Sequence, residues 1–150
     1  MGPIGQWPDA LELIYFPNGS NHCEHPSCID VCPTKATFKT DEGVVLVDAN
    51  RCFGCQYCVW ACPYEARSLN PNTKVVEKCT LCVDKLDAGE QPLCCYTCTT
   101  GARVAGDMND PDSRISKVLA ENADRVYRVH PEFGNEPKVV YLVPRKGAET

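Results

Sequence analysis

The chain has 150 residues, twelve of them cysteine, and a net charge of −5. This length fits one domain or two small ones, and the acidic balance, without a run of Lys or Arg, argues against nucleic acid as the main partner. No apolar run approaches the roughly 18 residues of a membrane span, and the first residues lack the basic and apolar segments of a secretion signal. Because reducing compartments keep thiols free, we expect metal ligation rather than disulfides.

The first 19 residues contain three prolines and predict an extended arm. Three cysteine groups follow this arm, separated by two connecting segments. The groups are Cys23-x4-Cys28-x3-Cys32-Pro33, Cys52-x2-Cys55-x2-Cys58-x3-Cys62-Pro63 and Cys79-x2-Cys82-x11-Cys94-x3-Cys98, with Cys95 as an additional cysteine in the third. Aliphatic side chains are few, so disulfides, zinc or iron–sulfur clusters must contribute part of the stability.

Each connecting segment predicts a β-hairpin, with turns at residues 40–43 and 70–72. Gly43 stands where the first turn favours a positive φ angle. The expected strands are residues 36–39, 44–48, 66–69 and 73–78. Cysteine loops that alternate with hairpins predict a repeated small unit.

The sequence changes character after Cys98. Residues 102–105 predict a short strand, and a helix is expected to begin with Asp112 or Ser113 as its cap. An apolar stripe on that helix is formed by Ile115, Val118 and Leu119. Residues 125–129 and 138–143 alternate or run apolar like two further strands.

The central cysteine group is the most specific motif. Cys52, Cys55 and Cys58 are spaced to surround one iron–sulfur cube, and the cysteine before Pro63 in such a run ligates the other cluster of a pair. A zinc site needs two converging pairs of ligands, which the central group does not offer. The third group, with two cysteine pairs, leaves a zinc ribbon open as an alternative.

This pairing rule gives a ligand map. One cluster is assigned to Cys32, Cys52, Cys55 and Cys58, and a second to Cys23, Cys28 and Cys62, for which only three thiols are visible. Ser20 stands where a fourth cysteine is expected, so it ligates through oxygen, or the cluster has three irons, or another group fills the position, or Ser20 is a loop serine. His22 and His25 are further candidates for ligation or for hydrogen bonds to sulfur, against the alternative of exposed loop histidines. The third cluster is assigned to Cys79, Cys82, Cys94 and Cys98, with Cys95 as a spare thiol or substitute ligand.

Three segments resemble the iron–sulfur subunits of the molybdopterin oxidoreductase family, which includes dimethyl sulfoxide, polysulfide, thiosulfate, tetrathionate and arsenate reductases. These are residues 21–33, the run from Cys52 to Tyr64, and Lys78-Cys79-Thr80-Leu81-Cys82. The stretch Gly106-Asp107-Met108-Asn109-Asp110-Pro111 and the later Lys138-Val139-Val140-Tyr141 are also similar. The usual first cysteine group of that family is missing here, as if the chain began after it, so we expect three clusters, mainly [4Fe-4S], with [3Fe-4S] as the alternative at Cys23, Cys28 and Cys62.

The resemblance implies an α+β fold of tandem bacterial ferredoxin-like units over residues 20–101, preceded by the arm at 1–19 and followed by a helix and strand extension at 102–150. It implies a non-catalytic subunit that relays single electrons between a quinol-linked membrane subunit, or another redox protein, and a molybdenum or tungsten pterin catalytic subunit. The implied location is cytoplasmic, membrane-associated through partners, or periplasmic by co-export. A free polyferredoxin is the main alternative, and a zinc-stabilised binding module is a third.

Overall fold

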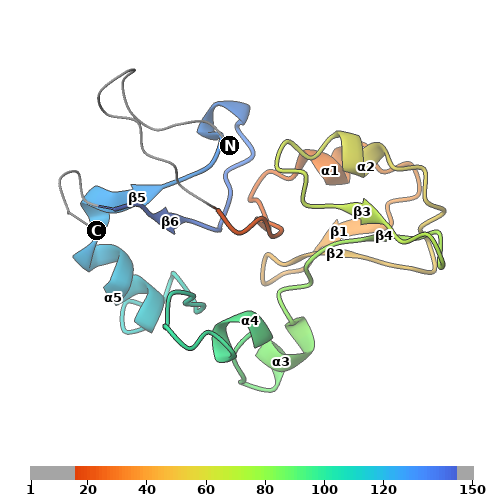
Figure 1. Cartoon of the computed structure of the whole chain (residues 1–150). Helices are drawn as coiled ribbons and strands as arrows, with labels where there is room; N and C mark the ends of the chain where they lie inside the picture. Colours follow the sequence, from red (N-terminus) through yellow and green to blue (C-terminus); the bar gives the residue numbers. More distant parts are fainter. Residues whose placement is uncertain (1–15, 145–150) are drawn as a thin grey trace.

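Short hairpins and short helices make up residues 16–144, the part of the chain that this computed structural model describes. Within this part there are three separate two-stranded sheets and five α-helices (Figure 1). None of the helices in this range is long and apolar enough to cross a bilayer.

The two predicted hairpins between the cysteine groups are present. Strand β1 (Thr37–Lys39) pairs antiparallel with β2 (Val45–Val47), and β3 (Ser68–Leu69) pairs antiparallel with β4 (Val76–Glu77). Gly43 has a φ of 83°, as the first turn requires. The strands are shorter than expected, but both turns lie where the sequence predicts them.

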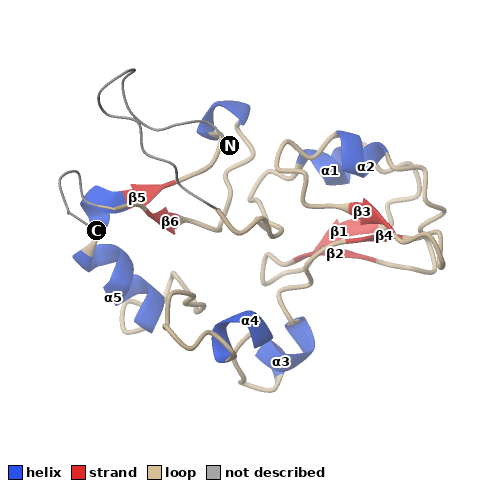
Figure 2. Ribbon diagram, viewed as in Figure 1, coloured by secondary structure: helices blue, strands red, loops and turns tan. Residues whose placement is uncertain are grey.

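Helices α1 (Ser27–Asp30) and α2 (Tyr57–Trp60) contact each other and lie together on one side of these hairpins (Figure 2). Each helix carries one cysteine and is followed, after a Cys-Pro pair, by a hairpin. The buried apolar residues of the described chain lie between residues 23 and 76 and are Cys23, Ala36, Val44, Val45, Cys58, Tyr64 and Val76. The apolar core is therefore small and contains two of the cysteines.

The third cysteine group is carried by α3 (Val83–Asp87), α4 (Leu93–Tyr96) and the residues beside them. In Figure 1 these two helices connect the hairpins to the C-terminal part of the chain. The expectation of a strand at residues 102–105 is wrong, because this segment has no regular secondary structure. A strand needs a partner for its backbone groups, and β5 and β6 pair with each other instead.

The C-terminal part follows the predicted order. Helix α5 (Arg114–Glu121) begins after Ser113, whose hydroxyl accepts a hydrogen bond from the Ser116 N–H at 3.2 Å. Two 3-10 helices, η1 (Ala123–Arg125) and η2 (Pro131–Phe133), accompany strands β5 (Val126–Tyr127) and β6 (Tyr141–Leu142), which pair antiparallel. Ser113 is thus the cap, and both strands are shorter than their predicted segments.

Most of the predicted N-terminal arm, residues 1–15, lies outside the described residues. The Phe16 ring packs against Tyr127 and Tyr141, with ring centroids 5.5 and 4.6 Å apart. The Tyr141 hydroxyl also donates a hydrogen bond to the Pro17 carbonyl at 3.1 Å. The segment just before the first cysteine group is therefore attached to the C-terminal sheet.

Residues 135–138, which we call the brace, hydrogen-bond along the first cysteine loop. The Glu24 N–H donates to the Glu136 carbonyl at 2.9 Å, and the Lys138 N–H donates to the Asn21 carbonyl at 3.0 Å. The side-chain oxygen of Asn135 accepts a hydrogen bond from the Ser27 N–H at 3.2 Å. Because no side chain caps α1 from within its own loop, Asn135 satisfies one of the free N–H groups at the start of this helix.

Replacing Asn135 with Ala tests the brace. The change leaves the Ser27 N–H without its partner, so we expect the free energy of unfolding to fall by about 1–3 kcal/mol. Thermal unfolding of the anaerobically purified protein measures this loss. The matched control is Asn109→Ala, at an exposed asparagine, and equal unfolding midpoints for the two variants would contradict the capping role.

Candidate metal centres

Four cysteines from two groups line one cavity of about 290 Å³, which we call cavity I. They are Cys32, Cys52, Cys55 and Cys58. The rest of its wall is uncharged and consists of Thr34, Ala36, Thr37, Phe53, Gly54, Gln56 and Val76. The structure thus brings together the four residues that the pairing rule assigns to one cluster.

The backbone around cavity I holds its thiols in a tight loop. Gly54 has a φ of 75°, and a Cβ atom there would overlap the carbonyl oxygen of Lys74. Gln56 is also left-handed, with a φ of 65°, and α2 begins directly after it. The Val76 N–H donates to the Cys52 sulfur at 3.5 Å. Sequence spacing suggested that Gly54 admits a close approach of the backbone, and the approaching segment is the turn between β3 and β4.

A second cavity of about 280 Å³, cavity II, is lined by Cys23, Cys28 and Cys62. Ser20 is also in its wall, as are His22, Tyr64, Arg67 and Lys78; the remaining wall residues are Asn21, Pro26, Val45 and Ala66. The three thiols that were assigned to the second cluster therefore converge, with Ser20 beside them. Cys58 of cavity I is close enough to influence the pKa of Cys28, so the two cavities are neighbours.

Burial makes the thiols of cavity II prefer their protonated form. It raises the pKa of Cys23 to about 11, and the nearby thiols Cys28 and Cys62 act in the same direction. Burial also raises the pKa of Cys28, while the Arg67 guanidinium opposes this shift. A bound metal ion takes the place of the thiol protons, so these groups suit iron better than they suit free thiolate.

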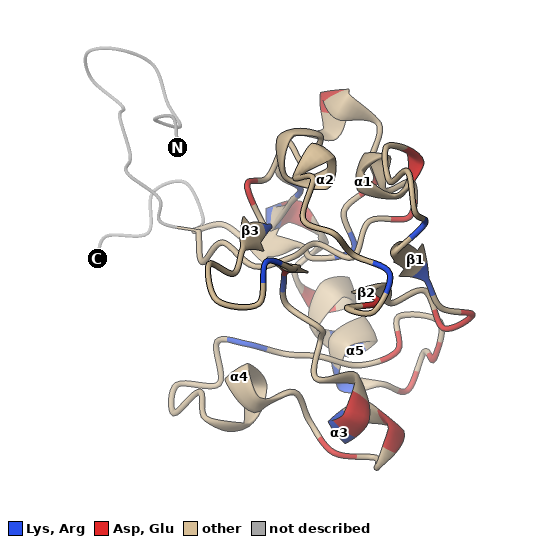
Figure 3. Cartoon of the chain, turned by 90° about the vertical axis from the view of Figure 1, so that its right-hand side faces the viewer, with Lys and Arg blue, Asp and Glu red and all other residues tan. Residues whose placement is uncertain are grey.

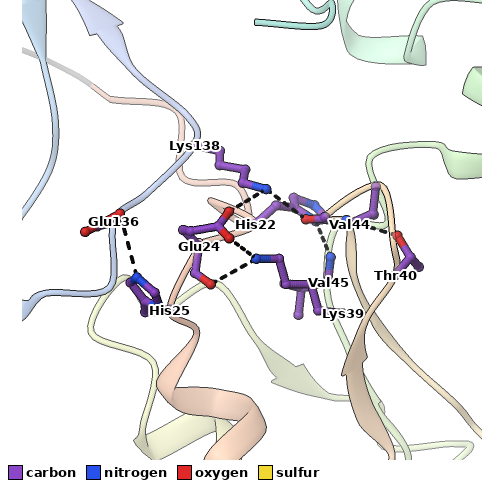
Figure 4. A network of polar contacts seen from close by, with 10 residues as sticks. His22, Glu24, His25, Lys39, Thr40, Val44, Val45, Glu136 and Lys138 are labelled. Carbon is purple, nitrogen blue, oxygen red and sulfur yellow. Dashed lines mark hydrogen bonds and ion pairs between the residues drawn. The ribbon is translucent and has the colours of Figure 1, made fainter. Parts of the chain in front are cut away.

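Two polar side-chain atoms of cavity II have no hydrogen-bond partner among the described residues, the His22 Nε2 and the Tyr64 hydroxyl. The His22 Nδ1 accepts a hydrogen bond from the Val45 N–H at 3.0 Å (Figure 4). Burial and the nearby Lys78 lower the pKa of His22 to about 3, so the ring is neutral and its proton is on Nε2. Nε2 is therefore a hydrogen-bond donor rather than a metal ligand.

These features fit an iron–sulfur group. Its sulfur atoms accept hydrogen bonds, and both cavities combine converging thiols with buried or backbone donors. Within residues 16–144, no three His, Cys, Asp or Glu side chains meet closely enough to hold a single metal ion. The thiols instead surround spaces of a larger size.

His25, the other candidate histidine, is exposed and lines neither cavity. It lies 3.9 Å from the Glu136 carboxylate of the brace. Beside it, the Glu24 carboxylate contacts Lys39 at 2.5 Å and Lys138 at 2.9 Å (Figure 4). Hydrogen bonds from these two lysines lower the pKa of Glu24 to about 2. This charged network joins the brace to β1, next to cavity II.

The third cysteine group lines neither cavity. Cys79 and Cys94 are exposed, while Cys82, Cys95 and Cys98 are half-buried. The Thr100 hydroxyl and nearby backbone N–H groups lower the pKa of Cys98 to about 7, whereas burial and Cys94 raise the pKa of Cys95. Figure 3 shows acidic residues gathered on and beside α3. These five thiols are therefore more open, and closer to negative charge, than the seven of the two cavities.

The chain is similar to known iron–sulfur and redox proteins. Residues 11–108 match a family described as the 4Fe-4S dicluster domain. A tetrathionate reductase subunit of Salmonella typhimurium is 47% identical over 129 residues, which cover 86% of this chain and 52% of the relative. A sulfite dehydrogenase subunit of Allochromatium vinosum is 45% identical over 95% of this chain and 61% of its own length. For a polypeptide of the polysulfide reductase of Wolinella succinogenes the values are 43%, 93% and 72%. The chain thus spans about half to three fifths of the first two relatives.

Replacing Gly54 with Ala tests the tight loop of cavity I. The new Cβ would overlap the Lys74 carbonyl, so we expect a lower unfolding midpoint and less iron bound per chain than in the unaltered protein. The matched control is Gly89→Ala, because Gly89 has the same φ of 75° with nothing within 4 Å of the added atom. Only the cost of the left-handed backbone, about 1–2 kcal/mol, applies there. Equal iron content and equal stability of the two variants would show that the close approach at Gly54 is unimportant.

Proposed function

The chain belongs to the 4Fe-4S dicluster domain family, and we propose that it works as the electron-transfer iron–sulfur subunit of a larger oxidoreductase. The family predicted from the sequence is thereby confirmed. Seven cysteines line two neighbouring cavities inside the matched region, and this convergence carries the proposal. Iron–sulfur clusters take up and release single electrons when bound, while the protein holds them, shields them and sets their potential.

At cavity I we propose a [4Fe-4S] cluster held by Cys32, Cys52, Cys55 and Cys58. At cavity II, Cys23, Cys28 and Cys62 would hold a cluster with only three thiolate ligands. The position of Ser20 in the wall of cavity II supports the idea that it stands in place of a fourth cysteine. Serine is a poor substitute for thiolate on iron, because soft sulfur ligands suit iron–sulfur clusters better than oxygen does. A [3Fe-4S] cluster at cavity II is therefore part of the proposal.

The third proposed cluster is held by Cys79, Cys82, Cys94 and Cys98, with Cys95 as a spare thiol. Cys98 supports this assignment, since its lowered pKa favours the thiolate form that binds metal. The exposure of Cys79 and Cys94 suggests that a partner protein or a further segment covers this site.

We also propose the predicted division of the chain, with a ferredoxin-like region at residues 20–101 and an extension at 102–150. In each of the first two units, a helix with a cysteine leads through a Cys-Pro pair into a hairpin, which supports a tandem arrangement. The extension supports the first unit directly, because the brace hydrogen-bonds to residues 21–27. Residues 1–19 would be the arm that precedes this region.

Partners are inferred from the relatives, whose names place them in multi-subunit tetrathionate, sulfite and polysulfide enzymes. We propose that this chain passes electrons between a quinol-linked membrane subunit and a molybdenum or tungsten pterin catalytic subunit. Three exposed aromatic residues, Phe53, Tyr57 and Trp60, line cavity I or lie on α2. Large exposed apolar groups are typical of protein interfaces, which supports a bound partner over a freely diffusing polyferredoxin.

The cluster assignment at cavity II is tested by Ser20→Cys. We expect the variant to bind one more iron per chain and to lose the three-iron EPR signal of the oxidised protein, because a fourth thiolate completes the cube. The control Ser68→Cys places a new thiol on exposed β3 and should leave both readings unchanged. A protein that binds no iron after anoxic reconstitution, or binds only zinc, would contradict the proposed function as a whole.

The subunit role is tested by affinity purification from the native host under anoxic conditions. We expect a pterin-containing catalytic subunit to copurify with the tagged chain, and the purified complex to reoxidise reduced quinol or a reduced viologen dye. The control is the chain with Trp60→Ser, which removes the most exposed aromatic side chain of α2 and should lower the yield of the partner. A monomer that elutes alone, with all of its clusters, would favour the polyferredoxin.

A further inference from the structure

Arg67 is an unusual residue of the cavity II wall, because its guanidinium group is buried without a carboxylate. The residue is only 6% exposed. One terminal nitrogen donates to the Cys28 sulfur at 3.0 Å, and the other donates to the Thr37 hydroxyl at 3.1 Å. Among residues 16–144, no ion pair joins Arg67 to an acidic side chain.

A second positive charge lies in the same wall. Lys78 is half-buried, and its amine donates hydrogen bonds to the backbone carbonyls of Val45 and Cys79. Carbonyl and hydroxyl groups are neutral, so none of these contacts balances the two charges. A buried charge is costly unless an opposite charge accompanies it. The groups of this wall that can become negative are the thiols and whatever they bind.

Cavity I differs in this respect, since its wall contains no charged side chain. The contrast is meaningful because the two cavities are neighbours and offer similar thiol ligands. An iron–sulfur group with thiolate ligands is anionic, and reduction makes it more so. A nearby cation therefore favours the reduced form and raises the reduction potential.

We propose that Arg67 is the counter-charge of the iron–sulfur group at cavity II and raises the reduction potential of that group, with Lys78 acting in the same direction. This inference rests on the proposed function. Arg67 acts through its hydrogen bond to Cys28 and is a positioning and tuning residue rather than a ligand. One electron enters the site from a redox partner protein, no bond is made or broken, and the fixed guanidinium charge requires no proton to follow.

The buried donors of cavity II are consistent with this role. The His22 Nε2–H and the Tyr64 hydroxyl are available to an acceptor inside the cavity, and hydrogen bonds to sulfur also raise the potential of such groups. Cavity II thus presents positive charge and free donors together, whereas cavity I presents mainly backbone and apolar groups.

The test is an EPR-monitored redox titration of the cluster-loaded protein, with dithionite as the reductant. The signal of cavity II is identified by its loss in Cys62→Ser, and that of cavity I by its loss in Cys55→Ser. We expect the midpoint of the cavity II group to fall in Arg67→Gln and to fall less in Arg67→Lys, which keeps the charge but loses the forked geometry. The midpoint of the cavity I group should change less than that of cavity II.

The matched control is Arg128→Gln, which removes the same charge from an exposed position outside both cavities. An unchanged cavity II midpoint in Arg67→Gln, or an equal shift in Arg128→Gln, would overturn the inference while leaving the proposed function intact. If Arg67→Gln does not retain iron at cavity II, Arg67→Lys and Lys78→Gln decide instead. A fall of the same midpoint in these variants supports the inference, and no change in either overturns it. Unaltered protein without any iron would instead overturn the proposed function.

Discussion

The structure depends on thiols that occupy the place where a larger protein would have an apolar core. Few apolar side chains are buried among the described residues, and Cys23 and Cys58 are two of them. Burial keeps the Cys23 thiol protonated, so metal binding must displace protons from groups that also hold the loops together. Folding and cofactor binding are then linked in one equilibrium, as in other small metal-binding domains.

Local signals in the sequence were sufficient for the elements and for the grouping of the cysteines. The turn at Gly43, the cap at Ser113 and the convergence of Cys32 with the central group each depend on residues at short or fixed spacing. The expected strand at 102–105 was wrong because strand formation requires a partner that local pattern does not specify. Ligand assignment at the third group stays a prediction, since its thiols line neither cavity.

Other features of the site had no signal in the sequence. Nothing about a single arginine in a predicted hairpin indicates that Arg67 is buried against a cysteine sulfur. Asn135 is 108 residues away from the helix that it caps, and such contacts become visible only in three dimensions. The result is an uneven distribution of charge, in which cations line cavity II, neutral groups line cavity I and acidic residues accompany α3.

The long separation between the brace and the first cysteine loop has a consequence for biosynthesis. Residues 32–76 contain every wall residue of cavity I, so this site is complete early in translation. Cavity II has its own wall within residues 20–78, but the loop around Cys23 and Cys28 acquires its hydrogen bonds only after residues 135–138 leave the ribosome. Maturation of the nascent chain is therefore ordered, with the neutral site able to form first and the cationic site secured last.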